Sequence, residues 1–242
     1  MKKIATILGA TALLALVATS AFAANQMRIS QVYSGGGNGT STYKQKFVEV
    51  FNSGNTAVNI TGWALVYGSS TGVWNTTGGT TFTNAWVFPS ATVQPCGYLL
   101  VSFLGTATVG ADLTTSITPD FQVITPSPII SMSGTSGKLM LAQSAPANGV
   151  ACGSEGVVIV DKVAYGPSST CFETAPTAVL SATLSAIRNR GGLTDTDNNS
   201  ADFTVAAPGV PRNAASPHNV LGSCAPSPTL RSTWGQVKSI YR

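Results

Sequence analysis

The chain has 242 residues, of which 9% are charged and 43% apolar, and it carries 25 glycines and 13 prolines. This composition excludes long amphipathic helices and is typical of many short strands joined by turns. A chain of this length buries one large β core without needing a metal or a second subunit.

Residues 1–23 have the pattern of a secretory signal peptide. Lys2 and Lys3 precede an apolar, alanine-rich run that ends in Ala21-Phe22-Ala23, a small-x-small cleavage pattern. The alternative, a retained membrane anchor, is disfavoured because Thr and Ser interrupt the apolar run. The sequence therefore predicts an exported bacterial protein that is secreted or held at the cell surface, with no integral membrane segment after signal cleavage.

Export changes the charge balance. Lys2 and Lys3 leave with the signal and three further bases follow Cys224, so the body of the chain has 8 basic and 9 acidic residues. Affinity for nucleic acid depends mainly on the neutralisation of phosphates. A near-neutral body thus predicts no nucleic-acid partner, and the pI of 9.0 belongs to the precursor.

The strongest strand signal lies in residues 46–63. A β-branched and aromatic run, Phe47-Val48-Glu49-Val50-Phe51, is followed by the turn residues Asn52-Ser53-Gly54-Asn55. Apolar and polar residues then alternate over 56–60, and a third run begins at Ala64. The pattern predicts a three-strand meander.

Several further strands are expected along the chain. They begin with Arg28-Ile29-Ser30-Gln31-Val32-Tyr33 and continue with Gly97-Tyr98-Leu99-Leu100-Val101, Gly137-Lys138-Leu139-Met140-Leu141 and Val160-Asp161-Lys162-Val163-Ala164-Tyr165. Residues 178–188 favour a helix by propensity alone. Together these segments predict an all-β domain.

This ordered set of segments resembles the lamin tail domain, an immunoglobulin-like β-sandwich found in nuclear lamins and in many secreted bacterial proteins. The likeness is carried by the F-V-E-V-F-N strand, the N-I-T-G-W-A-L that follows, and a closing D-T-D-N-N-S-A-D-F with Pro211-Arg212-Asn213 after it. It covers roughly residues 28–213. The resemblance implies an immunoglobulin-like β-sandwich over residues 24–224 and a strand, not a helix, ending at Arg188.

The resemblance also implies a role. Bacterial members often accompany separate catalytic domains, and this chain has no room for one. The implied function is a non-catalytic binding or structural module for adhesion, scaffolding or partner binding, whose partner is a protein or a component of the cell envelope or matrix.

Glu49 lies on the same side of its strand as Phe47 and Phe51. If those rings enter the core, the carboxylate enters with them and requires a cationic partner. Arg188, in another family-like segment, is the expected partner in a structural ion pair. The alternative is that the valines fill the core and Glu49 faces solvent.

Four cysteines in an exported chain predict two disulfides. Three pairings are possible, and the favoured one joins Cys152 to Cys171 and Cys96 to Cys224. The first pair brackets a strand whose flanking turns return both ends to one edge, and the second fixes the end of the domain to a central strand. Each closure stabilises by about 3 to 5 kcal/mol in the chain-entropy model. A zinc site is disfavoured because no Cys-x-x-Cys occurs.

One loop has the residue types of a calcium site. Asp195, Asp197, Asn199 and Asp202 place oxygen side chains near one another in a loop, and Ca²⁺ takes six to eight oxygen ligands. The alternative is an Asx-rich turn whose side chains cap their own backbone. Calcium is the only cofactor that the sequence suggests.

Catalysis has little support in the sequence. The single histidine, His218, lies beside Pro217 near the end of the domain, and no Gly-x-Ser-x-Gly elbow is present. The expectation is therefore that the protein is not an enzyme. The rival hypothesis is a small secreted hydrolase that uses carboxylates in an unrecognised cleft.

Residues 225–242 read as a tail separate from the domain. Ala225-Pro226-Ser227-Pro228 predicts a stiff spacer. Beyond it come aromatic and basic residues that predict a recognition element for a receptor or an anionic surface: Trp234, Lys238, Tyr241 and Arg242. The alternative is a remnant without function.

Overall fold

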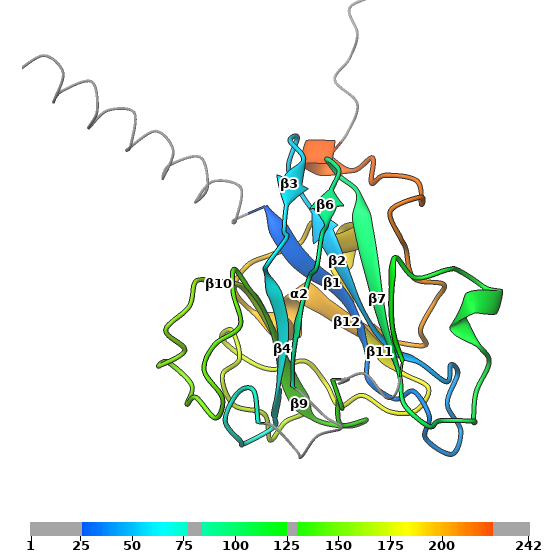
Figure 1. Cartoon of the computed structure of the whole chain (residues 1–242), viewed down its shortest axis with the longest axis vertical. Helices are drawn as coiled ribbons and strands as arrows, with labels where there is room; N and C mark the ends of the chain where they lie inside the picture. The colour runs from blue at the N-terminus through cyan, green and yellow to red at the C-terminus, as the bar shows by residue number, and fades with distance from the viewer. Residues whose placement is uncertain (1–25, 77–83, 125–129, 225–242) are drawn as a thin grey trace, which may run out of the picture.

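The computed structural model describes residues 26–76, 84–124 and 130–224, and forms two stacked β-sheets (Figure 1). The predicted signal peptide and the predicted recognition tail lie outside these residues. Within them, no helix is long and apolar enough to cross a membrane.

The larger sheet has six strands. In spatial order they are β12 (Phe203–Ala206), β11 (Ser185–Arg188), β1 (Met27–Tyr33), β2 (Lys46–Asn52), β7 (Tyr98–Leu104) and β8 (Phe121–Ile124). Neighbouring strands are antiparallel except β7 and β8, which are parallel. The strand predicted to end at Arg188 is β11.

The smaller sheet has four strands and a two-stranded ribbon lies beside it. The sheet order is β10 (Ile159–Tyr165), β9 (Gly137–Ala142), β4 (Ala64–Ser69) and β5 (Ala85–Val87), and the ribbon pairs β3 (Val58–Asn59) with β6 (Thr92–Val93). The short helices are η1 (Leu113–Thr115), η2 (Asn189–Gly192), α2 (Asn199–Asp202) and η3 (Gly222–Cys224).

The predicted meander over residues 46–67 is wrong. β2 pairs with β1 and β7 in one sheet, whereas β4 pairs with β5 and β9 in the other. The chain crosses between the sheets after β2, and at this turn the Asn52 side chain donates to the carbonyls of Thr56 and Val93, which ties the turn to β6. Local alternation predicted each strand, but pairing partners depend on the opposite sheet.

The main core lies between the two sheets and is filled largely by aliphatic side chains. β2 contributes Val48 and Val50 to it, facing Leu65 of β4 and Leu139 and Leu141 of β9. Since strand residues alternate, Phe47, Glu49 and Phe51 point to the other face of the large sheet. The valines therefore fill the central core, but Glu49 does not face solvent as the alternative also stated, because it is fully buried.

That other face is also covered. Phe47 packs with Tyr33, Tyr43, Leu100 and Leu113 in a second apolar cluster. The segment 207–224, which we call the C-terminal strap, runs beside β7 and ends at the Cys96–Cys224 disulfide (Figure 1). Glu49, which points to this covered face, is consequently fully buried.

The outer face of the small sheet is covered by loops. Trp74 packs there with Val66, Met140 and partly buried residues of the segment 150–159. The Cys152–Cys171 disulfide joins this covering layer to the loop after β10. Both disulfides have the pairing expected from the sequence.

Candidate functional site

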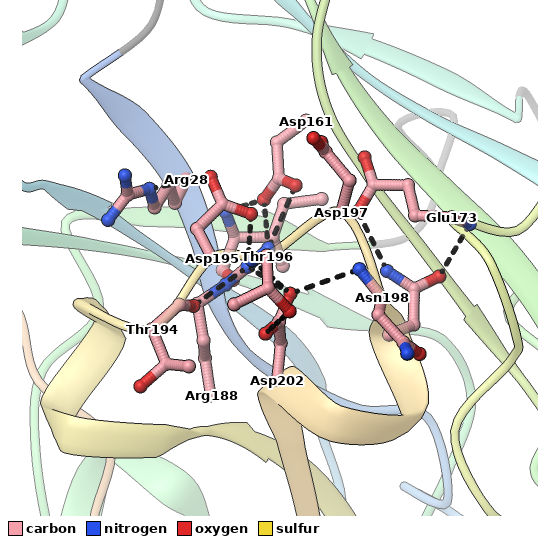
Figure 2. Close-up of polar contacts among 12 residues, drawn as sticks. Arg28, Asp161, Glu173, Arg188, Thr194, Asp195, Thr196, Asp197, Asn198 and Asp202 are labelled. Carbon is pink, nitrogen blue, oxygen red and sulfur yellow. Dashed lines mark hydrogen bonds and ion pairs between the residues drawn. The ribbon is translucent and has the colours of Figure 1, made fainter.

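A cluster of charged side chains around Arg188 lies where β11, β10 and the loop before α2 meet (Figure 2). Ile187 of β11 lies opposite Gln31 of β1, which lies opposite Glu49 of β2, so these three side chains share the outer face of the large sheet. Neighbouring strand residues alternate between faces, and Arg188 therefore points into the space between the sheets. Asp161 comes from β10 on the opposite side. Asp195 and Asp202 close the cluster from the loop and α2.

Arg188 is fully buried and its guanidinium is satisfied on every side. Nη2 donates to both carboxylate oxygens of Asp161 at 2.8 and 2.6 Å, and Nη1 donates to Asp195 Oδ1 at 3.0 Å. Nε and Nη1 also donate to the carbonyls of Ile29 and Thr194. A buried arginine is tolerated only when its donors find partners in this way.

Asp161 and Asp195 are held by further donors. The backbone N–H of Ile29 donates to Asp161 Oδ2 at 2.6 Å, so this carboxylate joins the two sheets. Asp195 Oδ2 forms an ion pair with Arg28 Nε at 2.9 Å. The cluster therefore links β1, β10, β11 and the loop before α2 by charge as well as by packing.

Asn199 and Asp202 organise the loop before α2. Asp202 accepts hydrogen bonds from the backbone N–H groups of Thr196 and Asn198 and from the Thr196 hydroxyl. Asn199 accepts from the backbone N–H groups of Ala164 and Glu173. Asp202 thus has the local backbone-capping role that the Asx-turn alternative described, whereas Asn199 joins α2 to the distant backbone of residues 164 and 173.

Glu173 is the least compensated acid of the cluster. Its Oε2 accepts a hydrogen bond from the Asn199 side chain at 2.9 Å. Burial, followed by the nearby charge of Asp161, raises the pKa of Glu173 to about 8, while Arg188 acts in the opposite direction. Burial also raises the pKa of Asp161. The cluster carries more negative charge than its two arginines neutralise.

The predicted calcium ligands are not assembled as one set. Asn199 and Asp202 use their oxygens inside the protein, and Asp197 is exposed with a φ of 54°. Within the described residues, the acids close enough to share an ion are Asp161, Glu173 and Asp195, whose oxygens lie within 4.8 Å of one another. Calcium binding by the four predicted residues therefore stays a prediction that this arrangement does not support, and a site formed by Asp161, Glu173 and Asp195 is a separate hypothesis.

The sequence contained one signal for this cluster. Asp161 is an acid within a strand that is mostly apolar, and if its side chain is buried it needs a partner. Glu173 and Arg28 had no comparable signal, because only the fold brings them to β10 and to the loop.

The predicted ion pair between Glu49 and Arg188 is wrong. Glu49 instead binds Arg212 of the strap, through Nη2 to Oε1 at 2.7 Å and through the Arg212 backbone N–H and Nε to Oε2. Ser30 also donates to Glu49 Oε1. Glu49 and Arg188 lie on opposite faces of the large sheet, which the register across β1 decides.

The Arg212 guanidinium is held by an aromatic ring. It lies over Tyr98 at 3.7 Å from the ring centroid, and Nη1 donates to the Tyr98 hydroxyl. Tyr98 in turn stacks on Phe51 and donates to the carbonyl of Gly191. The strap is therefore fastened to the sheet by an ion pair, a cation–π contact and the Cys96–Cys224 disulfide.

Comparison with known proteins agrees with this architecture. A solved structure of a DUF4876 family protein from Bacteroides thetaiotaomicron is 14% identical to the chain with a TM-score of 0.51, over 81% of this chain and 76% of that one. At this identity the likeness shows the fold alone. No curated protein matches the chain.

The family model of the Lamin Tail Domain matches residues 20–167. The match ends before β11, so it is shorter than the resemblance over residues 28–213 suggested. β11 and β12 nevertheless complete the large sheet beside β1. The match and the β-sandwich agree, and the chain belongs to the lamin tail domain family, whose domain is a non-enzymatic immunoglobulin-like module.

Proposed function

We propose that the protein is exported and acts at the cell surface or outside the cell as a non-catalytic module that binds an extended segment of a partner protein. The observation that carries this proposal is the free edge of β8. β8 pairs with β7 on one side, and within the described residues no strand pairs with its other side. Such an edge binds extended peptides by adding them as a further strand.

The side chains of β8 define the chemistry of the partner. Its sequence, Phe-Gln-Val-Ile, has no charge, and Ile124 is 47% exposed. Phe121 is half-buried and packs on Trp86 of β5, with ring centroids 5.3 Å apart. An added strand would meet apolar groups on both of its faces, so an uncharged, apolar segment fits best.

Binding to washed cell envelopes tests the proposal. Ile124→Asp places a charge on the exposed edge and is expected to weaken saturable binding of the purified protein at least tenfold, because a charge there must be desolvated. Val158→Asp is the matched control, since Val158 is 56% exposed in the loop before β10. Equal binding by both variants and the unaltered protein would show that β8 is not the binding edge.

The hydrolase hypothesis has one observation in its favour. Glu173 has a raised pKa and converges with Asp161, an arrangement also found among catalytic carboxylates. Against it, Asp161 is buried and both its oxygens accept from Arg188. A nucleophile or base must reach its substrate, so we assign these acids to the framework. Glycan or ester hydrolysis that Glu173→Gln abolishes would overturn this assignment.

The tail is proposed to retain the exported protein at the cell surface. The proposal rests on the aromatic and basic residues Trp234, Lys238, Tyr241 and Arg242, beyond the described domain. Deleting residues 233–242 is expected to move protein from the envelope fraction into the medium. Unchanged fractionation would exclude a retention role and leave the β8 proposal untouched.

A further inference from the structure

The two halves of the Cys152–Cys171 disulfide have different surroundings. Cys152 is exposed in a glycine-containing loop, with Gly153 and Gly156 on either side of Glu155. Cys171 is half-buried against the layer that covers the small sheet. An attacking thiol thus reaches the sulfur of Cys152 more easily than that of Cys171.

Lys138 binds the inner sulfur. This lysine is fully buried on β9, and its ammonium donates to Cys171 Sγ at 3.3 Å, to the Gly72 carbonyl at 2.6 Å and to the Thr170 hydroxyl at 2.9 Å. The ammonium also lies 5.2 Å from the centroid of the Trp74 ring. Three acceptors and an aromatic ring therefore fix the positive charge beside one sulfur of the bridge.

A fixed cation beside a sulfur favours its thiolate. A cysteine next to a lysine has a lowered thiol pKa, and a thiol of lower pKa is the better leaving group in thiol–disulfide exchange. Accessibility and leaving-group stability consequently select the same direction of attack: the incoming thiolate bonds to Cys152, and Cys171 departs.

We propose that Cys152–Cys171 is a reactive disulfide and that Cys152 is the site at which the protein forms mixed disulfides with thiols. The incoming thiolate forms an S–S bond with Cys152 Sγ as the bond between Cys152 and Cys171 breaks. The electron pair of the broken bond stays on Cys171 Sγ, whose negative charge Lys138 stabilises. No external oxidant or reductant is needed, because the reaction exchanges one disulfide for another.

The Cys96–Cys224 disulfide provides an internal comparison. Cys96 is buried, and within the described residues no lysine or arginine donates to either sulfur of this bridge. Both bridges hold one cysteine at positive φ, Cys96 at 55° and Cys171 at 60°, so the backbone conformation does not distinguish them. The two bridges differ in the buried Lys138 beside Cys171 and in the exposure of Cys152.

Mapping of the products in the unaltered protein tests the proposal directly. The oxidised, signal-free protein is incubated with reduced glutathione at neutral pH, quenched with iodoacetamide and digested. The expected product has glutathione on Cys152 and the alkyl group on Cys171, with Cys96–Cys224 intact. Glutathione mainly on Cys171, or opening of Cys96–Cys224 at an equal or higher rate, would overturn the proposal.

Substitution of Lys138 separates charge from accessibility. Lys138→Met is expected to slow opening of the bridge about three- to tenfold and to reduce the preference for Cys152, since the leaving thiolate loses its cation. Lys138→Arg is expected to retain most of the rate. Lys162→Met on β10 is the matched control and should leave the rate unchanged. A Lys138→Met protein that folds and reacts at the original rate would contradict the role of the charge. If Lys138→Met does not fold, the product map of the unaltered protein and the reaction rate of Lys138→Arg decide whether the proposal holds.

Discussion

The two arginines that meet buried carboxylates do so in different ways. Arg188 lies inside the sandwich with no exposed surface, and its partners Asp161, Asp195 and Asp202 surround it. Arg212 keeps 29% of its side chain exposed and binds the single buried acid Glu49 from the strap. The first pair belongs to the central framework, whereas the second attaches a peripheral segment. The same ion-pair chemistry therefore has different consequences when either arginine is removed.

The largest expected effect is that of Arg188→Met. It leaves Asp161 buried without its cation, and breaking a buried pair in this way costs about 3 to 5 kcal/mol. Urea unfolding measures the loss. The exposed neighbour Arg190 gives the control, since Arg190→Met should change the free energy of unfolding by less than about 0.5 kcal/mol. A cost below about 1 kcal/mol for Arg188→Met would show that the cluster does not depend on its cation.

Arg212→Met is expected to cost less, about 1.5 to 3 kcal/mol, because Glu49 keeps the Ser30 hydroxyl and the backbone N–H of residue 212 as donors. The strap should loosen while the sandwich stays folded. Limited proteolysis checks this, and cleavage within residues 207–221 should accelerate in the variant. If cleavage within the strands of the two sheets accelerated to the same extent, the strap would be part of the framework that keeps the sandwich folded.

The pH dependence of stability should further distinguish the cluster around Arg188 from the strap. The pKa of Glu173 rises from an ordinary value of 4.5 to about 8 in the folded protein, so between these pH values the folded state holds a proton that the unfolded state has lost. Its contribution to stability is complete below about pH 4.5 and is lost as pH rises through 8. Glu173→Gln should flatten this decline, measured by thermal unfolding from pH 5 to 9. A variant with the same decline would assign it to another group.

Calcium should have the smallest effect. A weak site of the kind found in extracellular modules, with a Kd on the order of 1 mM, would stabilise the protein by roughly 1.4 kcal/mol at 10 mM Ca²⁺. Because calcium competes with the proton on Glu173, the rise in melting temperature should be larger at pH 8 than at pH 5. Magnesium at the same ionic strength is the control. An equal melting temperature with and without calcium at pH 8 would show that calcium does not bind to this cluster.

Alternation along the chain predicted individual elements well and their partners poorly. The run 47–51 was expected as a strand and lies within β2, and residues 185–188 form the strand that the family resemblance implied. The meander failed because β2 and β4 are consecutive in sequence yet belong to different sheets. Strand propensity is local, whereas the choice of sheet depends on which faces can be buried together.

The amino-acid sequence by itself indicated the fold class and the family, favoured the disulfide pairing that the structure shows, and suggested that Glu49 needs a partner if it is buried. Only the tertiary structure decided that this partner is Arg212, because the register of β11 on β1 turns Arg188 to the opposite face. It alone also placed Lys138 on the sulfur of Cys171 and brought Asp161, Glu173 and Asp195 together. Composition and periodicity are properties of neighbouring residues, but buried charges are compensated by groups that come from distant parts of the chain, and those meet only once the sheets have packed.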